Sequence, residues 1–264
     1  MLKHRIISAL IGIPLLIGVS YLGGIYWRAL LALLAGLAMF EYLDMMRVKK
    51  LQPMVLPAYF IMAVLLFRGP FSSYLPVLFG AGLSLMIIAM LAGTESTFDD
   101  LVFSFFGAFY IGYTFAFAID LAVLENSFYY LLLVFILTWA SDVGGYLFGM
   151  LWGRHKLAPL LSPGKTWEGA LGAVLLTITV TMVFNHLIGI CSISWRYMLL
   201  LGILASVAAQ VGDLHESGMK RYFGVKDSGR VIPGHGGVLD RFDSFMLVLP
   251  VVYYFLVVFA CNLE

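Results

Sequence analysis

Nine apolar stretches follow one another along this chain, and they limit its possible folds more than any other feature. A helix needs about 20 apolar residues to cross a bilayer, and all the stretches except the short third one approach that length. Because 62% of the residues are apolar and only 12% are charged, the sequence argues strongly against a water-soluble enzyme. We predict an all-α, polytopic integral membrane protein with about nine transmembrane helices in a single domain, residues 1–264. The stretches are 6–24, 27–46, 53–67, 74–92, 101–123, 128–150, 168–190, 196–212 and 244–262.

The positions of the basic residues predict the orientation of these helices, since lysine and arginine near helix ends are retained on the cytoplasmic side. With nine spans and a cytoplasmic N-terminus, 13 of the 16 Lys and Arg residues lie on that side, and the exceptions are Arg28, Arg68 and Arg196. One span more or fewer before residue 150 would divide the basic loops between the two faces. We therefore predict a cytoplasmic N-terminus, an external C-terminus and an uncleaved first span.

The predicted cytoplasmic segment 213–243 holds five acidic and five basic residues in a chain that has few charges elsewhere. If the eighth helix continues into this segment, four polar side chains share one face: Asp213, Glu216, Ser217 and Lys220. Asp240 and Asp243 lie three residues apart before the last span, so one helical turn would direct both the same way. Clustered carboxylates at a membrane surface suit Mg²⁺ bound together with a phosphate.

A glycine-rich turn at residues 232–237 separates these acids. Its glycines, including Gly236 and Gly237, permit backbone N–H groups to approach an anion closely. The basic residues around it are Lys226, Arg230 and Arg241. Together they predict a cradle for the phosphates of a nucleotide. The alternative is a solvated connector in which His235 is only a turn residue, but membrane topology alone requires no acids in such a loop.

The loop before the seventh span contains Ser162-Pro163-Gly164-Lys165-Thr166. It is not a Walker motif, because Pro159 occupies the place of the first glycine and we expect no strand before it. Ser162, Lys165 and Thr166 would still favour an anion at the N-terminus of the helix, and we assign them to nucleotide binding. A simple helix cap beside a cytoplasmic lysine explains the same residues equally well.

Asp142 lies about eight residues inside the sixth span, which places it ~12 Å from the cytoplasmic end of that helix. A carboxylate at this depth costs several kcal/mol unless it is paired or faces water, so it marks a functional cavity. Three other acids near predicted helix ends are interpreted as structural, snorkelling or in contact with water: Glu41, Asp44 and Asp120.

Segment 217–243 closely resembles the signature of the phosphatidate cytidylyltransferases, also called CDP-diacylglycerol synthases. The matching residues are Ser217, Lys220-Arg221, Lys226-Asp227, Ile232-Pro233, His235-Gly236-Gly237, Asp240-Arg241 and Asp243. No position in this segment departs from the pattern. Further matches extend the resemblance to about 140–243, the family-like catalytic part: Ser141-Asp142, Ser162-Pro163, Lys165-Thr166 and Glu168-Gly169.

The resemblance implies transfer of the cytidylyl group of CTP to phosphatidic acid, giving CDP-diacylglycerol and pyrophosphate, with Mg²⁺ required. We expect Asp213, Asp240 and Asp243 to bind the metal and Asp142 to line the site. The residues expected to contact phosphates are Lys165, Lys220, Arg221, Lys226 and Arg241, while Ser217, Asp227 and His235 complete the site. The resemblance also implies a homodimer, and the small size favours a bacterial plasma membrane.

Two alternatives remain at this point. A secondary transporter would use Asp142 and the loop acids to bind a coupling cation, although no inverted repeat is evident. A CTP-dependent polyprenol kinase would transfer the γ-phosphoryl group instead. The net charge of +1 gives no indication of a nucleic-acid partner, and we expect none.

Overall fold

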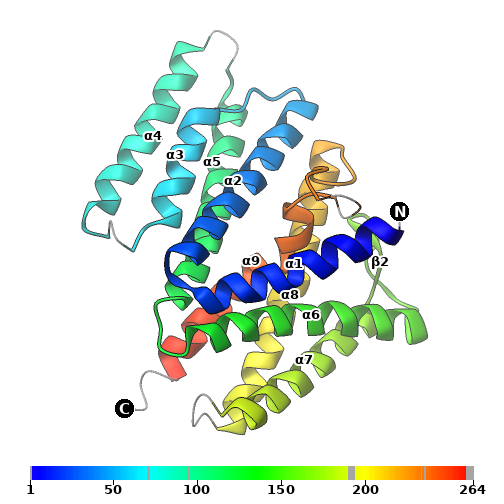
Figure 1. Cartoon of the computed structure of the whole chain (residues 1–264). Coiled ribbons are helices and arrows are strands. Elements are labelled where there is room, and N and C mark those ends of the chain that lie inside the picture. The colour runs from blue at the N-terminus through cyan, green and yellow to red at the C-terminus, as the bar shows by residue number, and fades with distance from the viewer. Residues whose placement is uncertain are drawn as a thin grey trace. The chain divides into compact units, whose positions relative to one another are not determined.

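The computed structural model describes residues 2–69, 72–93, 96–189, 194–232, 234 and 236–259. Each of the nine predicted spans coincides with a helix in these residues (Figure 1), so the predicted all-α membrane fold class is confirmed. The elements are α1 (Leu2–Leu22), α2 (Gly24–Val48), α3 (Val55–Leu66), η1 (Ser72–Tyr74), α4 (Leu75–Ala92), α5 (Phe98–Leu121), α6 (Ser127–Trp152), β1 (Lys156–Ala158), β2 (Ser162–Thr166), α7 (Trp167–Ile188), α8 (Trp195–Phe223) and α9 (Leu239–Phe259).

Seven helices in the described part of the chain are long and apolar enough to cross a membrane. The apolar segments Leu10–Leu22 and Val55–Leu66 are shorter than these seven. The number of crossings and the cytoplasmic N-terminus therefore stay predictions. Helix α8 continues eleven residues beyond the predicted end of its span, to Phe223, which makes the first part of the charged segment helical.

One feature of the loop before α7 differs from the prediction. Strands β1 and β2 form an antiparallel hairpin in which Lys156 pairs with Thr166 and Ala158 with Ser162. The expectation that no strand precedes the Gly164-Lys165-Thr166 sequence is therefore wrong. Only three and five residues form these strands, and a stretch this short shows no alternation that could predict them.

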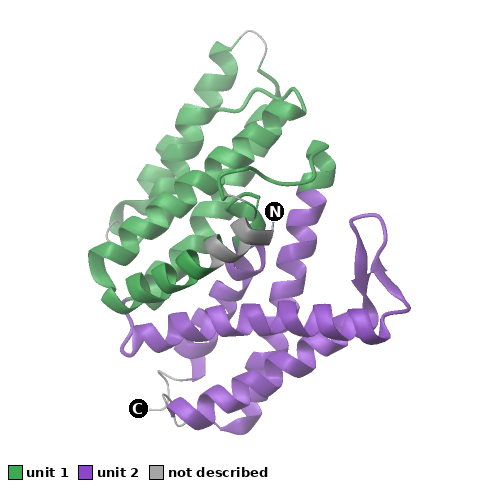
Figure 2. Cartoon of the chain, turned by 45° about the vertical axis from the view of Figure 1, so that its right-hand side comes forward, with its two compact units in different colours: residues 1–122, 220–241 green, residues 123–219, 242–264 purple. Residues whose placement is uncertain are grey.

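The helices divide into two compact units, coloured separately in Figure 2. Unit 1 comprises residues 1–122 and 220–241, and unit 2 comprises residues 123–219 and 242–264. The two units are defined by packing alone. The single membrane domain predicted for residues 1–264 therefore stays a prediction.

Within unit 1, α3 packs against α4 and α5, and α2 packs against α5. The buried indole N–H of Trp27 on α2 donates to the carbonyl oxygen of Ala118 on α5, 2.9 Å away. The 2% exposed Asp100 takes part in the capping box at the start of α5 and accepts from the backbone N–H of Gln52 at 2.7 Å. The first bond joins α2 to α5, and the second joins α5 to the linker before α3; both satisfy polar groups that burial would otherwise penalise.

Within unit 2, α6 and α7 form a closely packed antiparallel pair. A Cβ on Gly144 of α6 would lie 2.7 Å from the carbonyl oxygen of Gly172 on α7, so the two backbones touch there. Small residues that permit such contact are typical of helix pairs in membranes. Helix α9 packs on the same unit through stacked rings of Phe245 and Phe135, whose centroids are 4.8 Å apart.

Candidate functional site

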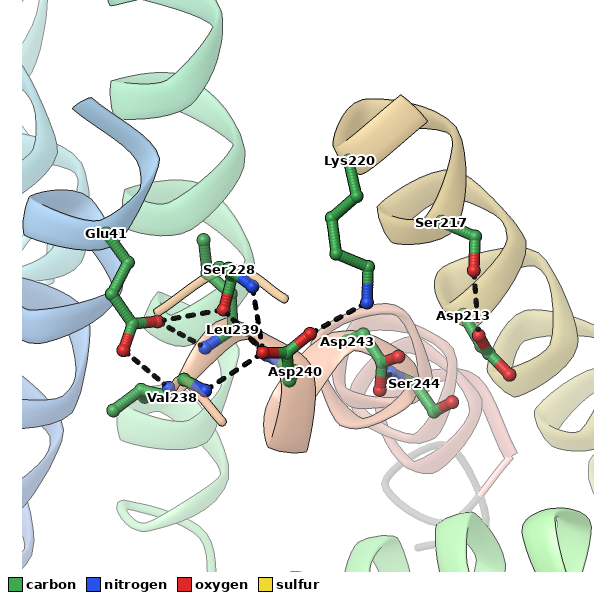
Figure 3. A network of polar contacts seen from close by, with 11 residues as sticks. Glu41, Asp213, Ser217, Lys220, Ser228, Val238, Leu239, Asp240, Asp243 and Ser244 are labelled. Atoms are coloured by element: carbon green, nitrogen blue, oxygen red, sulfur yellow. Dashed lines mark hydrogen bonds and ion pairs between the residues drawn. The ribbon is translucent and has the colours of Figure 1, made fainter. Parts of the chain in front are cut away.

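Lys165 and Asp213 join the two polar loops that the sequence singled out. The Lys165 Nζ lies 2.6 Å from Asp213 Oδ2, and the side chains are 22% and 36% exposed. One turn further along α8, Ser217 Oγ donates to Asp213 Oδ1 at 3.4 Å (Figure 3). The predicted shared face of Asp213 and Ser217 is thus present because α8 stays helical through both residues.

The start of α7 shows that one of the predicted nucleotide-binding residues has a structural role. Thr166 is the N-cap of this helix, and its side chain accepts from the backbone N–H of Gly169 at 3.1 Å. Ser162 lies in β2 opposite Ala158. The helix-cap interpretation therefore explains Thr166, whereas Lys165 extends to the acid on α8.

Glu168 fixes the base of the hairpin, a role that the sequence reasoning did not assign. Its carboxylate accepts from the backbone N–H groups of Arg154 and His155 and lies 2.6 Å from His155 Nδ1. The signal for this role was an acid in the first turn of a helix, where free N–H groups favour negative charge.

A row of polar side chains continues from Asp213 back along α8. Gln210 donates to the Ala170 carbonyl oxygen and to Ser206 Oγ, both at 3.2 Å. Ser206 Oγ in turn lies 3.3 Å from Ser141 Oγ on α6. Asp142 follows Ser141 and is exposed in the isolated chain. The role of Asp142 in lining a functional cavity stays a prediction.

Gly212 brings α9 against α8 beside two of the predicted metal ligands. A Cβ on Gly212 would lie 2.5 Å from the carbonyl oxygen of Asp243 and 3.0 Å from Ser244 Cα. The backbones therefore touch at a point that adjoins Asp213 on one helix and includes Asp243 on the other. The Asp243 carboxylate accepts from the Ser244 N–H at 2.6 Å.

Asp240, the third predicted ligand, lies in a dense set of hydrogen bonds within unit 1 (Figure 3). Its Oδ1 is 2.7 Å from Lys220 Nζ, and the two side chains are 6% and 14% exposed. Its Oδ2 accepts from the backbone N–H groups of Ser228 and Gly237, both at 2.9 Å, and lies 3.0 Å from Ser228 Oγ. The N–H of Gly237, which we expected to face a nucleotide phosphate, is directed at a carboxylate of the protein.

In the glycine-rich segment, Ile232 N–H donates to the Gly236 carbonyl oxygen at 2.9 Å. Gly234 and Gly236 have φ values of 77° and 86°, a left-handed conformation that glycine adopts without strain. Their presence is therefore a backbone requirement. Pro233 and His235 lie outside the described residues, so the role predicted for His235 stays a prediction.

Glu41 corrects the sequence interpretation. We expected this side chain to snorkel or contact water, but it is 1% exposed. It accepts from the backbone N–H groups of Val238 and Leu239 and from Ser228 Oγ, at 2.8, 3.0 and 3.1 Å. No sequence signal connects residue 41 with a loop almost 200 residues away.

The other two acids interpreted as structural have basic partners. Asp44 pairs with Arg47 on the exposed end of α2, and Asp120 pairs with Arg68 at 2.5 Å. Five charged residues of the signature segment are exposed: Arg221, Lys226, Asp227, Arg230 and Arg241. Four of these five are basic, so the surface of this segment favours anions.

The described residues contain no group of three or more Asp, Glu, His or Cys side chains placed to hold one metal ion. A magnesium site does not need such a group, because Mg²⁺ is commonly held by one or two carboxylates together with substrate phosphates. Asp213 is paired with Lys165, and Asp243 lies where the backbones of α8 and α9 touch, so the roles of both as metal ligands stay predictions. Asp240 is already engaged by Lys220, Ser228 and Gly237, and its role as a ligand stays a prediction.

The amino-acid sequence of this chain is similar to those of known proteins over nearly its whole length. The model of the cytidylyltransferase family matches residues 3–259. A protein of Staphylococcus epidermidis named phosphatidate cytidylyltransferase is 36% identical over 261 residues, which cover 97% of this chain and 99% of that protein. Proteins of the same name from Staphylococcus saprophyticus and Staphylococcus aureus are 36% and 34% identical, with the same coverage. Because the similarity extends over almost the whole chain, well beyond the signature segment, the chain belongs to the cytidylyltransferase family.

Proposed function

We propose that this protein transfers the cytidylyl group of CTP to phosphatidic acid and so forms CDP-diacylglycerol and pyrophosphate. The observation that carries the proposal is the nearly full-length similarity to proteins named phosphatidate cytidylyltransferase. The polar groups support it, since the two loops joined by Lys165 and Asp213 carry the basic residues that two polyanionic substrates require. The signature supplies further exposed bases.

In the proposed reaction, a phosphate oxygen of phosphatidic acid attacks the α-phosphorus of CTP. A new P–O bond forms, the bond between the α-phosphorus and the bridging oxygen breaks, and pyrophosphate leaves with the electron pair. The nucleophile is already an oxyanion, so no strong general base is needed. The main work of the protein is to hold negatively charged groups in line and stabilise the charge that develops.

The basic residues divide this work according to their environment. Lys165 and Lys220 are partly buried and held by Asp213 and Asp240, so their ammonium groups have defined positions from which to contact phosphates. The exposed bases of the signature segment attract and bind the triphosphate. Asp213 and Asp243 are the residues that would hold Mg²⁺, which when bound supplies positive charge to the transferring phosphates.

We place the reaction at the cytoplasmic face of a bacterial plasma membrane, with the acyl chains of phosphatidic acid remaining in the bilayer. The apolar helices and the bacterial relatives support this location. The distribution of Lys and Arg supports the cytoplasmic side. The homodimer implied by the family resemblance is part of the same proposal.

The full-length protein, purified in detergent and given phosphatidic acid with CTP labelled at the α-phosphate, should transfer label into a lipid extract. A chelator should abolish the transfer and added Mg²⁺ should restore it, because the paired carboxylates suit a hard divalent ion. Label at the γ-phosphate should stay in water. The opposite pattern would identify a lipid kinase, and solute counterflow without a labelled lipid would identify a transporter.

The predicted orientation can be tested with single cysteines in a variant whose native Cys191 and Cys261 are replaced by serine. Arg230→Cys should react with a membrane-impermeant maleimide only in inside-out vesicles, and Glu125→Cys only in right-side-out vesicles. Both positions are exposed and lie in loops that the span count places on opposite faces. Labelling of both from the same side would contradict the nine-span topology.

A further inference from the structure

Helix α2 supplies a buried acid to a signature loop that lies almost 200 residues further along the chain. We propose that Glu41 is a positioning residue of the transfer reaction, which holds the segment from Ser228 to Leu239 and, through Ser228, orients the Asp240 carboxylate beside Lys220. The inference rests on the proposed function, because it assigns Glu41 a part in that reaction. All these residues belong to unit 1.

Glu41 is buried among hydrogen-bond donors. The side chain is 1% exposed, and three donors surround its carboxylate. Two of them are the backbone N–H groups of Val238 and Leu239 at the start of α9, where a helix has N–H groups without partners in its own backbone. Glu41 thus provides from another helix the N-terminal cap of α9, with a charge that favours the helix dipole.

Two glycines of the signature segment pack closely on this carboxylate. A Cβ on Gly229 would lie 2.6 Å from Glu41 Oε1, and a Cβ on Gly237 would collide with both Glu41 and Ser228. Two glycines of the signature segment therefore have a steric reason that is independent of any ligand. These two glycines therefore allow the signature segment to pack directly on Glu41.

Ser228 transmits the effect of Glu41 to Asp240. Its Oγ lies 3.1 Å from Glu41 Oε2 and 3.0 Å from Asp240 Oδ2, and it accepts from the Asp240 N–H at 3.3 Å. A hydroxyl group has one proton, so it can donate to only one of the two carboxylates at a time. A change at residue 41 therefore alters what Ser228 offers to Asp240, and Asp240 in turn determines the position of the Lys220 ammonium group.

Helix α2 also holds the other end of the loop. Lys49, directly after α2, donates to the Tyr222 carbonyl oxygen at 2.9 Å and lies 3.2 Å from the centroid of the Tyr222 ring. The ring of Tyr42 contacts that of Phe223 edge to face, with centroids 5.7 Å apart. The end of α8 and the start of α9 are both bound to α2, so α2 determines the geometry of the loop between them.

The test compares Glu41→Gln, Ser228→Ala and the double variant in the full-length protein. Glutamine has the size of glutamate but one acceptor oxygen, so its NH₂ group would face a donor. We expect kcat for CDP-diacylglycerol formation to fall about tenfold to a hundredfold in each single variant, with KM for CTP changed less than about twofold. Since Glu41 acts through Ser228, the double variant should be little slower than the slower single variant.

The matched control is Asp44→Asn, one turn along the same helix, where the carboxylate is exposed. It should retain wild-type kcat. If the losses of kcat in the two single variants multiply in the double variant, and if the amount of folded protein falls in parallel, the role of Glu41 is purely structural. That result would overturn the proposal. Wild-type kcat in Ser228→Ala would overturn it even if Glu41→Gln failed to fold. If the unmodified protein forms no CDP-lipid, the proposed function fails instead.

Discussion

Asp243→Asn should lower the rate of CDP-diacylglycerol formation by about a hundredfold or more in the purified protein, while the protein stays folded. The substitution removes one negative charge at the crossing of α8 and α9, where the backbone of Asp243 meets Gly212. A carboxylate that holds a divalent ion against two phosphates acts on the charge of the transition state, so the loss should appear in kcat. The measurement is the initial rate with labelled CTP, accompanied by a thermal unfolding curve.

Asp243 is a sharper probe than Asp240, although the signature contains both. Replacing Asp240 would also disturb Lys220, Ser228 and Gly237, so a loss of activity would combine folding with chemistry. Asp44→Asn again serves as the control for a lost surface carboxylate. Near-normal turnover by folded Asp243→Asn would remove Asp243 from the metal-binding role, and an unchanged magnesium requirement in a slower variant would do the same.

The helices and the main site segment could be predicted because their signals are local. Burial in hydrocarbon requires long apolar runs, and each predicted run coincides with a helix among the described residues, although α8 extends eleven residues further. The spacing of Asp213 and Ser217 required only that α8 continue, and it does. The fixed positions from Ser217 to Asp243 carried the family assignment, which the similarity over residues 3–259 confirms.

The remaining site geometry could not be predicted because it depends on tertiary contacts. A carboxylate near the end of a predicted helix has the same sequence signature whether it faces water or caps a distant helix, so the sequence alone favours contact with water for Glu41. The sequence predicts that the glycine turn directs its N–H groups at a nucleotide phosphate, whereas in the structure the N–H of Gly237 faces the carboxylate of Asp240. The packing of α2 against the signature loop determines which anion the N–H of Gly237 faces.

The contact between α8 and α9 is also a tertiary contact, and no spacing in the sequence indicates it. Gly212 and Gly218 are both interior residues of α8 and lie on either side of Ser217 and Asp213 in the chain. A Cβ on Gly212 would meet backbone atoms of Asp243 and Ser244 at 2.5 to 3.1 Å, whereas one on Gly218 would meet only the side chain of Leu161 at 3.8 to 4.0 Å. Helix propensity is the same for both substitutions, so the two positions differ mainly in packing.

Gly212→Ala should therefore destabilise the protein by about 1–3 kcal/mol, because backbone atoms cannot move aside as a side chain can. It should also lower kcat about tenfold or more, since moving α9 away from α8 separates Asp243 from Asp213. Gly218→Ala should keep wild-type activity and the same or a higher unfolding midpoint, because alanine is the better helix former. Thermal unfolding and the labelled-CTP assay measure both effects. Equal behaviour of the two variants would show that the crossing at Gly212 does not hold the acidic pair together.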